Sequence, residues 1–333
     1  MAVEATLRPR GPYSLRLSAR SDATRTFRDG VLTMLLPVDG RPEAVRAWQG
    51  ADGTIHVHAL SEAAIERLRF VLALDDDHTP FLRRFAQDPL LGPATRELGG
   101  LRPMRVATVA QALLRALCGQ LIQARRARAI EWKVIQSAMP AREGLHAPPT
   151  AVALGRFSPA ELRKLGLHAR RGATLVRLCR GLDLERLHSI PTATVAERLG
   201  RERGLGPWSI GVICLEGLGR RERGLTRDLG LVKLCSALRG RPVEAAETDE
   251  LLEPYGDWAG LASVYLLAAL HRGLIPNCGA LDSVYGSRPS TGGHLGSRQD
   301  RRVAPFRPAE RELAAAGGNS RYGAPRRTGR GAR

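Results

Sequence analysis

The chain has 333 residues, 43% of them hydrophobic, which is enough for two domains that each bury a core. Its 51 Lys and Arg residues against 33 Asp and Glu give a formal net charge of +18, which favours a polyanionic partner. No apolar run reaches the roughly 18 residues that cross a bilayer, and the N-terminus lacks a signal-peptide pattern, so we expect a cytoplasmic protein with no membrane partner.

Residues 1–73 are predicted to form a small α+β domain. Alternating apolar and polar residues predict strands at 14–18 and 55–59, and the apolar run at 31–36 predicts a third strand. Ser61 then precedes a helical pattern in which apolar residues recur three and four positions apart. We therefore expect an antiparallel sheet with one helix.

Residues 74–281 have a helical pattern almost throughout. Polar residues, glycines and prolines separate the apolar periods from one another. Helices are predicted at 107–118, 124–138, 158–165, 168–182, 194–199, 207–218, 229–238 and 258–271. The five cysteines are widely spaced along the chain, which argues against a disulfide framework or a metal site.

The composition changes in the last segment, residues 282–333. From 286 onwards there are 11 arginines and three acidic residues, a net +8, among many Gly, Pro and Ser residues. Such a segment buries too little apolar surface to offset the entropy of ordering it, so we predict a disordered tail. The remaining charge, +18 − 8 = +10, belongs to the folded part.

The most informative stretch is LGRERGLGPWS, residues 199–209, which joins two predicted helices. Gly204 and Gly206 enclose Leu205, an apolar residue that would fill the space between the helices. Backbone N–H groups of the glycines and of the next helix start, up to Ser209, would then be free to bind a phosphate. An ordinary Gly-capped turn is the alternative. The Pro-Trp pair that follows in a basic domain favours a phosphate-binding helix-hairpin-helix.

Asp228 lies twenty residues after Trp208, directly before an apolar helical run. By itself this position indicates a helix N-cap.

Taken together, the motifs resemble the helix-hairpin-helix DNA glycosylase superfamily, and within it the 3-methyladenine DNA glycosylase II (AlkA-type) branch. The resemblance spans about residues 76–273. Its segments follow one another in the family's order: 114–122, 165–171, 204–209, 217–219, 228–231 and 257–258. It implies a mostly α fold, in which a two-lobed helical glycosylase region follows a small α+β domain.

The resemblance makes Asp228 the catalytic acid, a role that is compatible with capping. An N-glycosidic bond breaks through an oxocarbenium-like transition state, which a carboxylate beside the sugar stabilises.

The resemblance also assigns residues that would contact the flipped base and the duplex. The base pocket would contain Trp208, Val212 and Leu267. Leu121, after Gln120, takes the position of the wedge that fills the gap left by the base. A buried leucine at a helix end is the alternative for Leu121.

Trp208 stands where the lyase branch of the superfamily has a lysine, so no amine is placed to form a Schiff base. The four cysteines that bind an iron–sulfur cluster in the endonuclease III branch are missing as well. We therefore expect no metal and no cofactor, apart from a monovalent cation that the hairpin backbone could hold.

These features predict a monomeric, monofunctional glycosylase of base excision repair. It would flip an alkylated purine, 3-methyladenine or 7-methylguanine, out of double-stranded DNA and hydrolyse its N-glycosidic bond. DNA binding would associate it with a bacterial-type nucleoid. Val212 and Leu267 replace aromatic residues usual in the branch, and Arg227 beside the acid is unusual. These departures leave a second interpretation open: a catalytically weak or inactive hairpin protein that binds DNA.

Overall fold

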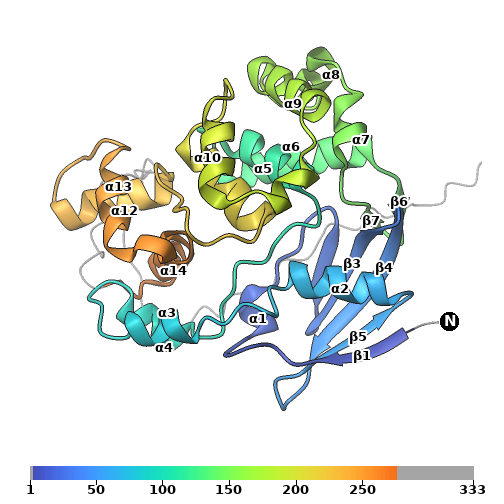
Figure 1. The fold of residues 1–333 in the computed structure, drawn as a ribbon. Coiled ribbons are helices and arrows are strands. Elements are labelled where there is room, and N and C mark those ends of the chain that lie inside the picture. The colour runs from blue at the N-terminus through green and yellow to red at the C-terminus, as the bar shows by residue number, and fades with distance from the viewer. Residues whose placement is uncertain (1–2, 276–333) are drawn as a thin grey trace, which may run out of the picture. The chain divides into compact units, whose positions relative to one another are not determined.

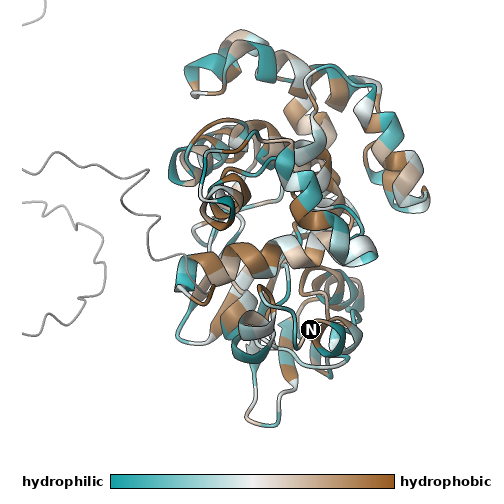
Figure 2. Ribbon diagram, turned by 90° about the vertical axis from the view of Figure 1, so that its left-hand side faces the viewer, coloured by the Kyte–Doolittle hydropathy of each residue, from teal (hydrophilic) through white to brown (hydrophobic). Residues whose placement is uncertain are grey.

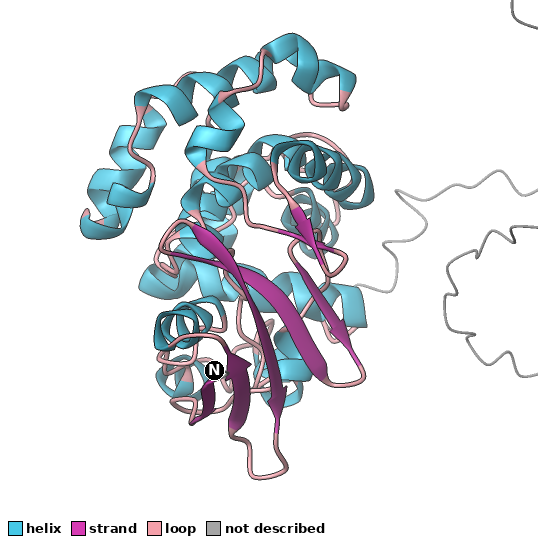
Figure 3. Cartoon of the chain, turned by 90° about the vertical axis from the view of Figure 1, so that its right-hand side faces the viewer, coloured by secondary structure: helices cyan, strands magenta, loops and turns pink. Residues whose placement is uncertain are grey.

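The N-terminal part of the chain forms a five-stranded antiparallel sheet in the computed structural model, which describes residues 3–275 (Figure 3). The strand order is β1-β5-β4-β3-β2. The strands are β1 (Val3–Leu7), β2 (Arg25–Arg28), β3 (Val31–Val38), β4 (Arg41–Gln49) and β5 (Ile55–Ala59). Helix α2 (Glu62–Val71) packs on this sheet, and its N-cap Ser61 accepts a hydrogen bond from the backbone of Ala64, as the sequence predicts.

The predicted strand at residues 14–18 is wrong. This segment forms a short helix, α1 (Leu15–Ser18), whose N-cap Ser14 accepts a hydrogen bond from the backbone of Leu17. Leu15 is buried in the sheet's apolar cluster, and the Ser18 hydroxyl accepts a hydrogen bond from the backbone of Arg102 at 2.9 Å. Five alternating residues do not distinguish a strand from one capped helical turn, and the tertiary contacts decide in favour of the turn.

In the rest of the described chain nearly all the regular secondary structure is helical, so the fold is mostly α, as predicted (Figure 1). All eight predicted helices are present within two residues of the expected bounds, although the last turn of 207–218 is a π-helix, η2 (Ile213–Gly217). The helices are α3 (Thr79–Arg84), α4 (Gly92–Glu97), α5 (Val109–Gly119), α6 (Ala124–Ala138), α7 (Ala151–Gly155), α8 (Pro159–Lys164), α9 (Ala169–Gly181), α10 (Thr192–Gly200), α11 (Pro207–Val212), α12 (Leu229–Arg239), α13 (Glu247–Leu252) and α14 (Ala259–Arg272).

Several short elements were not predicted from the sequence. They are the helices α3, α4, α7 and α13, the hairpin β6 (Ala141–Arg142) and β7 (Leu145–His146), and the 3-10 helices η1 (Glu185–Ser189) and η3 (Glu253–Trp258). The strands β1, β2 and β4 were not predicted individually either. None of the described helices has the length and apolar character needed to span a membrane. The predicted tail, 282–333, lies outside the described residues, as do positions 276–281.

The helices fall into two groups by their contacts (Figure 1). Helices α5 to α11 pack mainly on one another, whereas α4 packs on α14, which also contacts α12, α13 and η3. Tyr265 of α14 fastens this second group, because its hydroxyl donates to the carbonyl oxygens of Leu98 and Leu101, both at 3.0 Å. Apolar and polar stretches alternate along the helices in Figure 2, as expected for helices with one buried face. One apolar cluster runs through both groups.

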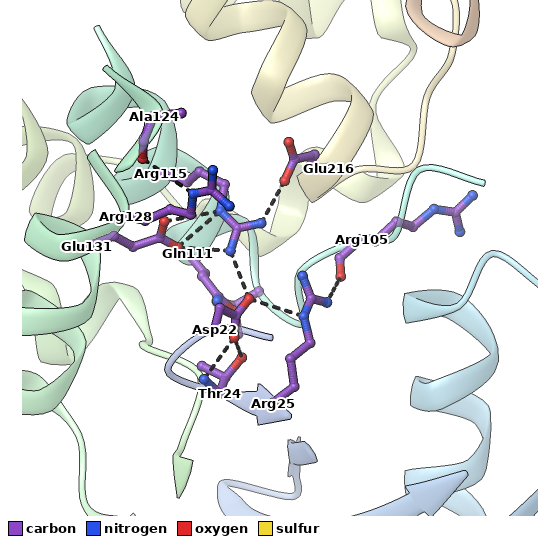
Figure 4. A network of polar contacts seen from close by, with 11 residues as sticks. Asp22, Thr24, Arg25, Arg105, Gln111, Arg115, Ala124, Arg128, Glu131 and Glu216 are labelled. Carbon is purple, nitrogen blue, oxygen red and sulfur yellow. Dashed lines mark hydrogen bonds and ion pairs between the residues drawn. The ribbon is translucent and has the colours of Figure 1, made fainter. Parts of the chain in front are cut away.

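A partly buried ionic network joins the sheet to the helices (Figure 4). The Arg115 guanidinium of α5 lies 3.0 Å from Asp22, 3.0 Å from Glu131 of α6 and 2.7 Å from Glu216 of η2. Arg25 pairs with the same Asp22 at 3.1 Å. Burial lowers the pKa of Arg115, but the three carboxylates outweigh it and raise this pKa well above the usual value. Arg115 is therefore a permanent positive charge at the centre of the network.

Replacing Arg115 with methionine should lower the free energy of unfolding by about 3–5 kcal/mol, because three carboxylates would stay together without their shared cation. The matched control is Arg201→Met, which removes an arginine paired with Glu197 on the exposed surface of α10 and should cost less than about 1 kcal/mol. Urea unfolding followed by circular dichroism measures both variants. Equal, small losses would contradict a central role for Arg115.

Candidate active site

The predicted hairpin joins α10 to α11. Leu205 is 8% exposed and belongs to the apolar cluster, so it fills the space between the helices, as expected. Gly204 has a φ of +97°, and a β-carbon there would lie 2.6 Å from Oγ1 of Thr174 in α9. Backbone conformation and close approach together therefore require glycine at this position.

The hairpin leaves backbone donors free. Within the part of the chain that the structure describes, the N–H groups of Gly204 and Gly206 have no hydrogen-bond acceptor. Gly206 is the N-cap of α11, and its carbonyl accepts from the backbone of Ile210 at 3.0 Å. The Ser209 side chain is buried, and its hydroxyl accepts a hydrogen bond from Gln120. A phosphate contact by Ser209 would therefore come from its backbone N–H and not from its hydroxyl.

Gln120 and Leu121 follow the last residue of α5, and Gln120 contacts the hairpin. The Gln120 Nε2 donates to the Gly204 carbonyl oxygen and to Ser209 Oγ, both at 2.9 Å. Leu121 has a φ of +54° and is 84% exposed. The alternative of a buried leucine at a helix end is therefore wrong. Leu121 thus combines a left-handed backbone conformation, which is uncommon for a bulky residue, with an apolar side chain turned to solvent.

Asp228 is the N-cap of α12, so the capping prediction is confirmed. Its Oδ1 accepts from the backbone N–H of Gly230 at 2.7 Å, and its Oδ2 accepts from the Trp208 indole N–H at 2.9 Å. The residue is half-buried. The carboxylate is thus held by donors on both oxygens and keeps access to solvent.

The turn before Asp228 is fastened to the helices behind it. Arg227 has a φ of +65°, and its backbone N–H donates to Oγ1 of the fully buried Thr248 in α13 at 2.7 Å. Leu225 donates in the same way to Ser263 Oγ of α14 at 2.9 Å. The Arg227 side chain is exposed. The backbone next to Asp228 is therefore held in place, while the guanidinium of Arg227 is accessible to an anion.

The three expected pocket residues lie in different surroundings. Trp208 is half-buried at the start of α11, beside Asp228. Leu267 of α14 is close to the first turn of α12, because a β-carbon on Gly230 would lie 2.5 Å from its Cδ2. Val212 is 4% exposed, inside the apolar cluster. The structure thus brings both Trp208 and Leu267 to the start of α12, and places Val212 in the core.

Two surface cavities lie elsewhere. One, of about 410 Å³, lies between α2 and His188, and the other, of about 560 Å³, lies between α10 and η3. Neither is lined by Asp228 or Trp208. Between residues 3 and 275, no three His, Cys, Asp or Glu side chains are grouped as ligands for a metal ion.

Gly119 is a site residue whose role the sequence did not reveal. A β-carbon there would overlap the indole of Trp208 at Cη2 and lie 3.2 Å from Cζ3. Gly119 and Gln120 belong to the motif at 114–122, but no sequence pattern indicates which distant side chain packs against the α5 backbone. Thr248 and Ser263, which fasten the turn before Asp228, gave no signal in the sequence either.

Known proteins share this architecture. DNA-3-methyladenine glycosylase of Bacillus subtilis (strain 168) is 24% identical over 210 residues, which cover 60% of this chain and 69% of that protein. The 3-methyladenine DNA glycosylase of Archaeoglobus fulgidus has a similar structure, with a TM-score of 0.71 at 21% identity over 81% of this chain and 98% of the other. No protein-family model matches the sequence.

A second similar structure comes from another functional class. It is the Clostridium acetobutylicum 8-oxoguanine glycosylase/lyase bound to double-stranded DNA, with a TM-score of 0.67 at 18% identity over 82% of this chain and 98% of that one. These likenesses show that the chain has the fold of known DNA glycosylases.

Adding a methyl group at Gly119 should disturb the site. Gly119→Ala replaces glycine with a better helix former, yet the contact with Trp208 should make it destabilising by about 1–3 kcal/mol. The control is Gly181→Ala at the end of α9, where a β-carbon meets nothing within 4 Å, so this change should be neutral or slightly stabilising. Thermal unfolding and tryptophan fluorescence measure both. An unchanged fluorescence spectrum for Gly119→Ala would contradict the contact.

Proposed function

We propose that the protein is a DNA glycosylase that flips an alkylated base out of duplex DNA and hydrolyses its N-glycosidic bond. The carrying observation is the Asp228 carboxylate, held on both oxygens and half-exposed at the start of α12, with the hairpin beside it through Trp208. The relative from Bacillus subtilis, named DNA-3-methyladenine glycosylase, supports this class of activity, and the AlkA-type branch is the one we propose.

Duplex DNA is the proposed partner. The free N–H groups of Gly204 and Gly206 suit a phosphate, since unpaired amides at a helix start bind anions without reading sequence. Exposed arginines at the starts of α6 and α9 add positive charge: Arg125, Arg126, Arg128 and Arg170. The exposed side chain of Leu121 would enter the duplex and occupy the space of the flipped base.

In the proposed reaction, water attacks the sugar C1′ as the bond to the base breaks. The Asp228 carboxylate stabilises the positive charge that develops on the sugar, and it orients the water and accepts its proton. The base leaves with the bonding electron pair. The products are the free base and an intact strand with an abasic site.

We propose that the enzyme has no lyase activity. The helix start that carries Trp208 has no amine, and the chain's lysines, Lys133, Lys164 and Lys233, lie on other helices. An indole nitrogen cannot form an imine with the sugar aldehyde. Likewise, no metal takes part in the proposed mechanism, and a monovalent cation at the hairpin backbone would only bridge to a phosphate.

The proposed substrates are 3-methyladenine and 7-methylguanine. Their positive charge already weakens the glycosidic bond, so a pocket with one aromatic residue, Trp208, suffices to release them. The aliphatic Val212 and Leu267 favour the second candidate, a hairpin protein that binds DNA with little or no catalysis. Asp228 favours the enzyme.

Release of free base from a duplex with one 7-methylguanine tests the function. Wild-type protein should release it, faster than hypoxanthine from a matched duplex, whereas Asp228→Asn should slow release by roughly 10²–10³-fold or more and still bind the duplex. Asn keeps the helix cap but removes the charge. Asp29→Asn, on the exposed turn between β2 and β3, is the control for the loss of one negative charge and should be fully active. A wild-type protein that binds the duplex but releases no base would support the second candidate.

The reaction products test the proposed lack of lyase activity. After complete base release, the strand should remain intact until alkali and heat are applied. Borohydride added during the reaction should trap no covalent protein–DNA complex, because Trp208 supplies no amine. A trapped complex would show that another amine attacks the sugar, and the monofunctional mechanism would then be wrong.

A further inference from the structure

We propose that Trp208 is a positioning residue for the catalytic carboxylate, in addition to any contact with the base. Its indole N–H holds Asp228 in the orientation that the reaction needs. This proposal rests on the proposed glycosylase function and adds to it a specific task for one hydrogen bond.

The two donors on Asp228 are independent of each other. The Gly230 N–H, at 2.7 Å from Oδ1, belongs to the same helix start and would accompany any capping aspartate. The Trp208 Nε1–H, at 2.9 Å from Oδ2, comes from α11, twenty residues away in the chain. One donor would leave the carboxylate free to rotate about its bond to the β-carbon. Two donors on different oxygens fix its plane, and the remaining lone pairs then point in set directions.

The indole is itself held firmly. Its six-membered ring lies against the backbone of Gly119, where no β-carbon would fit, and the ring packs on the apolar cluster. The hydrogen-bonding edge therefore reaches Asp228 from a ring that is fixed on its other side by α5. An indole N–H also has no acceptor capacity, so it can only donate to the acid and cannot take up a proton from the water.

The backbone contacts around Asp228 do not serve this purpose. The bond from Arg227 to Thr248 and the bond from Leu225 to Ser263 fix the main chain of the turn. They leave the side-chain torsions of Asp228 unrestrained. Among the described residues, Trp208 is the one side chain that donates a hydrogen bond to this carboxylate. Trp208 therefore both positions the Asp228 carboxylate and packs α11 on the apolar cluster.

The test is an isosteric replacement of Trp208 by 3-benzothienylalanine, in which sulfur replaces the N–H and the aromatic faces remain. The single-turnover rate at saturating protein should fall roughly 10- to 100-fold, the loss expected for a misplaced catalytic group. The loss should be similar for 7-methylguanine and hypoxanthine, and the dissociation constant for lesion DNA should change less than about twofold. The same replacement at Trp132 on α6 is the control and should leave the rate unchanged.

Other outcomes have definite meanings. An unchanged rate with the isostere, together with slow release by Trp208→Ala, would show that the ring acts only by stacking or packing, and would overturn the proposal. A wild-type protein that releases no base would overturn the proposed function first, and this proposal with it.

A second readout does not depend on activity. In the nitrogen-15-labelled protein, the indole N–H signal that Trp208→Phe removes should shift, and exchange faster with solvent, in Asp228→Asn. The other three indole signals should stay in place. No shift would mean that the hydrogen bond is absent in solution, which would also overturn the proposal.

Discussion

The hydrogen bond from the Trp208 indole to Asp228 connects the parts of the molecule that matter for its chemistry. It joins the first residues of α11, which carry the hairpin, to the first residue of α12, which carries the acid. The indole in turn lies on the backbone of Gly119, one residue before Gln120 and two before the exposed Leu121. The hairpin, the loop that carries Leu121 and the Asp228 carboxylate are thereby connected to one another. For a proposed reaction in which the base must leave the stack, this rigidity matters because a misplaced group loses most of its effect.

Backbone strain is concentrated at the same place. Leu121 and Arg227 both adopt a left-handed conformation, which costs a bulky residue of order 1–3 kcal/mol. Each is held by a neighbouring hydrogen bond: Gln120 is bound to the hairpin, and the Arg227 N–H is bound to the buried Thr248. Such strain persists only where the surrounding structure compensates for it, and here it places one apolar side chain in solvent and one carboxylate at a helix start. The strain at these two residues lowers the free energy of unfolding, to which the ion pairs of Arg115 contribute.

The similarity to known glycosylases concerns the fold more than the details. The second group of helices combines α3 and α4, from before the hairpin region, with α12 to α14, from after it, and Tyr265 fastens the two parts through Leu98 and Leu101. Solved structures of both a glycosylase and a glycosylase/lyase are similar to this chain in fold. A fold can host several chemistries when the site residues differ, and the proposals about this chain therefore concern its own side chains.

The sequence by itself determined eight of the helical segments after residue 73, the turn that joins α10 to α11, and the position of Asp228 before an apolar run. It could do so because helix periodicity, caps and Gly-Pro signals act over a few residues. It also supplied the motifs that resemble the helix-hairpin-helix DNA glycosylase superfamily. It did not determine that residues 14–18 form a helical turn, that Ser209 faces inwards towards Gln120, that Val212 is buried in the core, or that Leu121 is exposed. Nor did it show that Gly119 makes room for Trp208 or that Thr248 holds Arg227. These features depend on which side chains meet across 20 to 90 residues of chain, and only tertiary packing decides such contacts, since no local pattern encodes the partner.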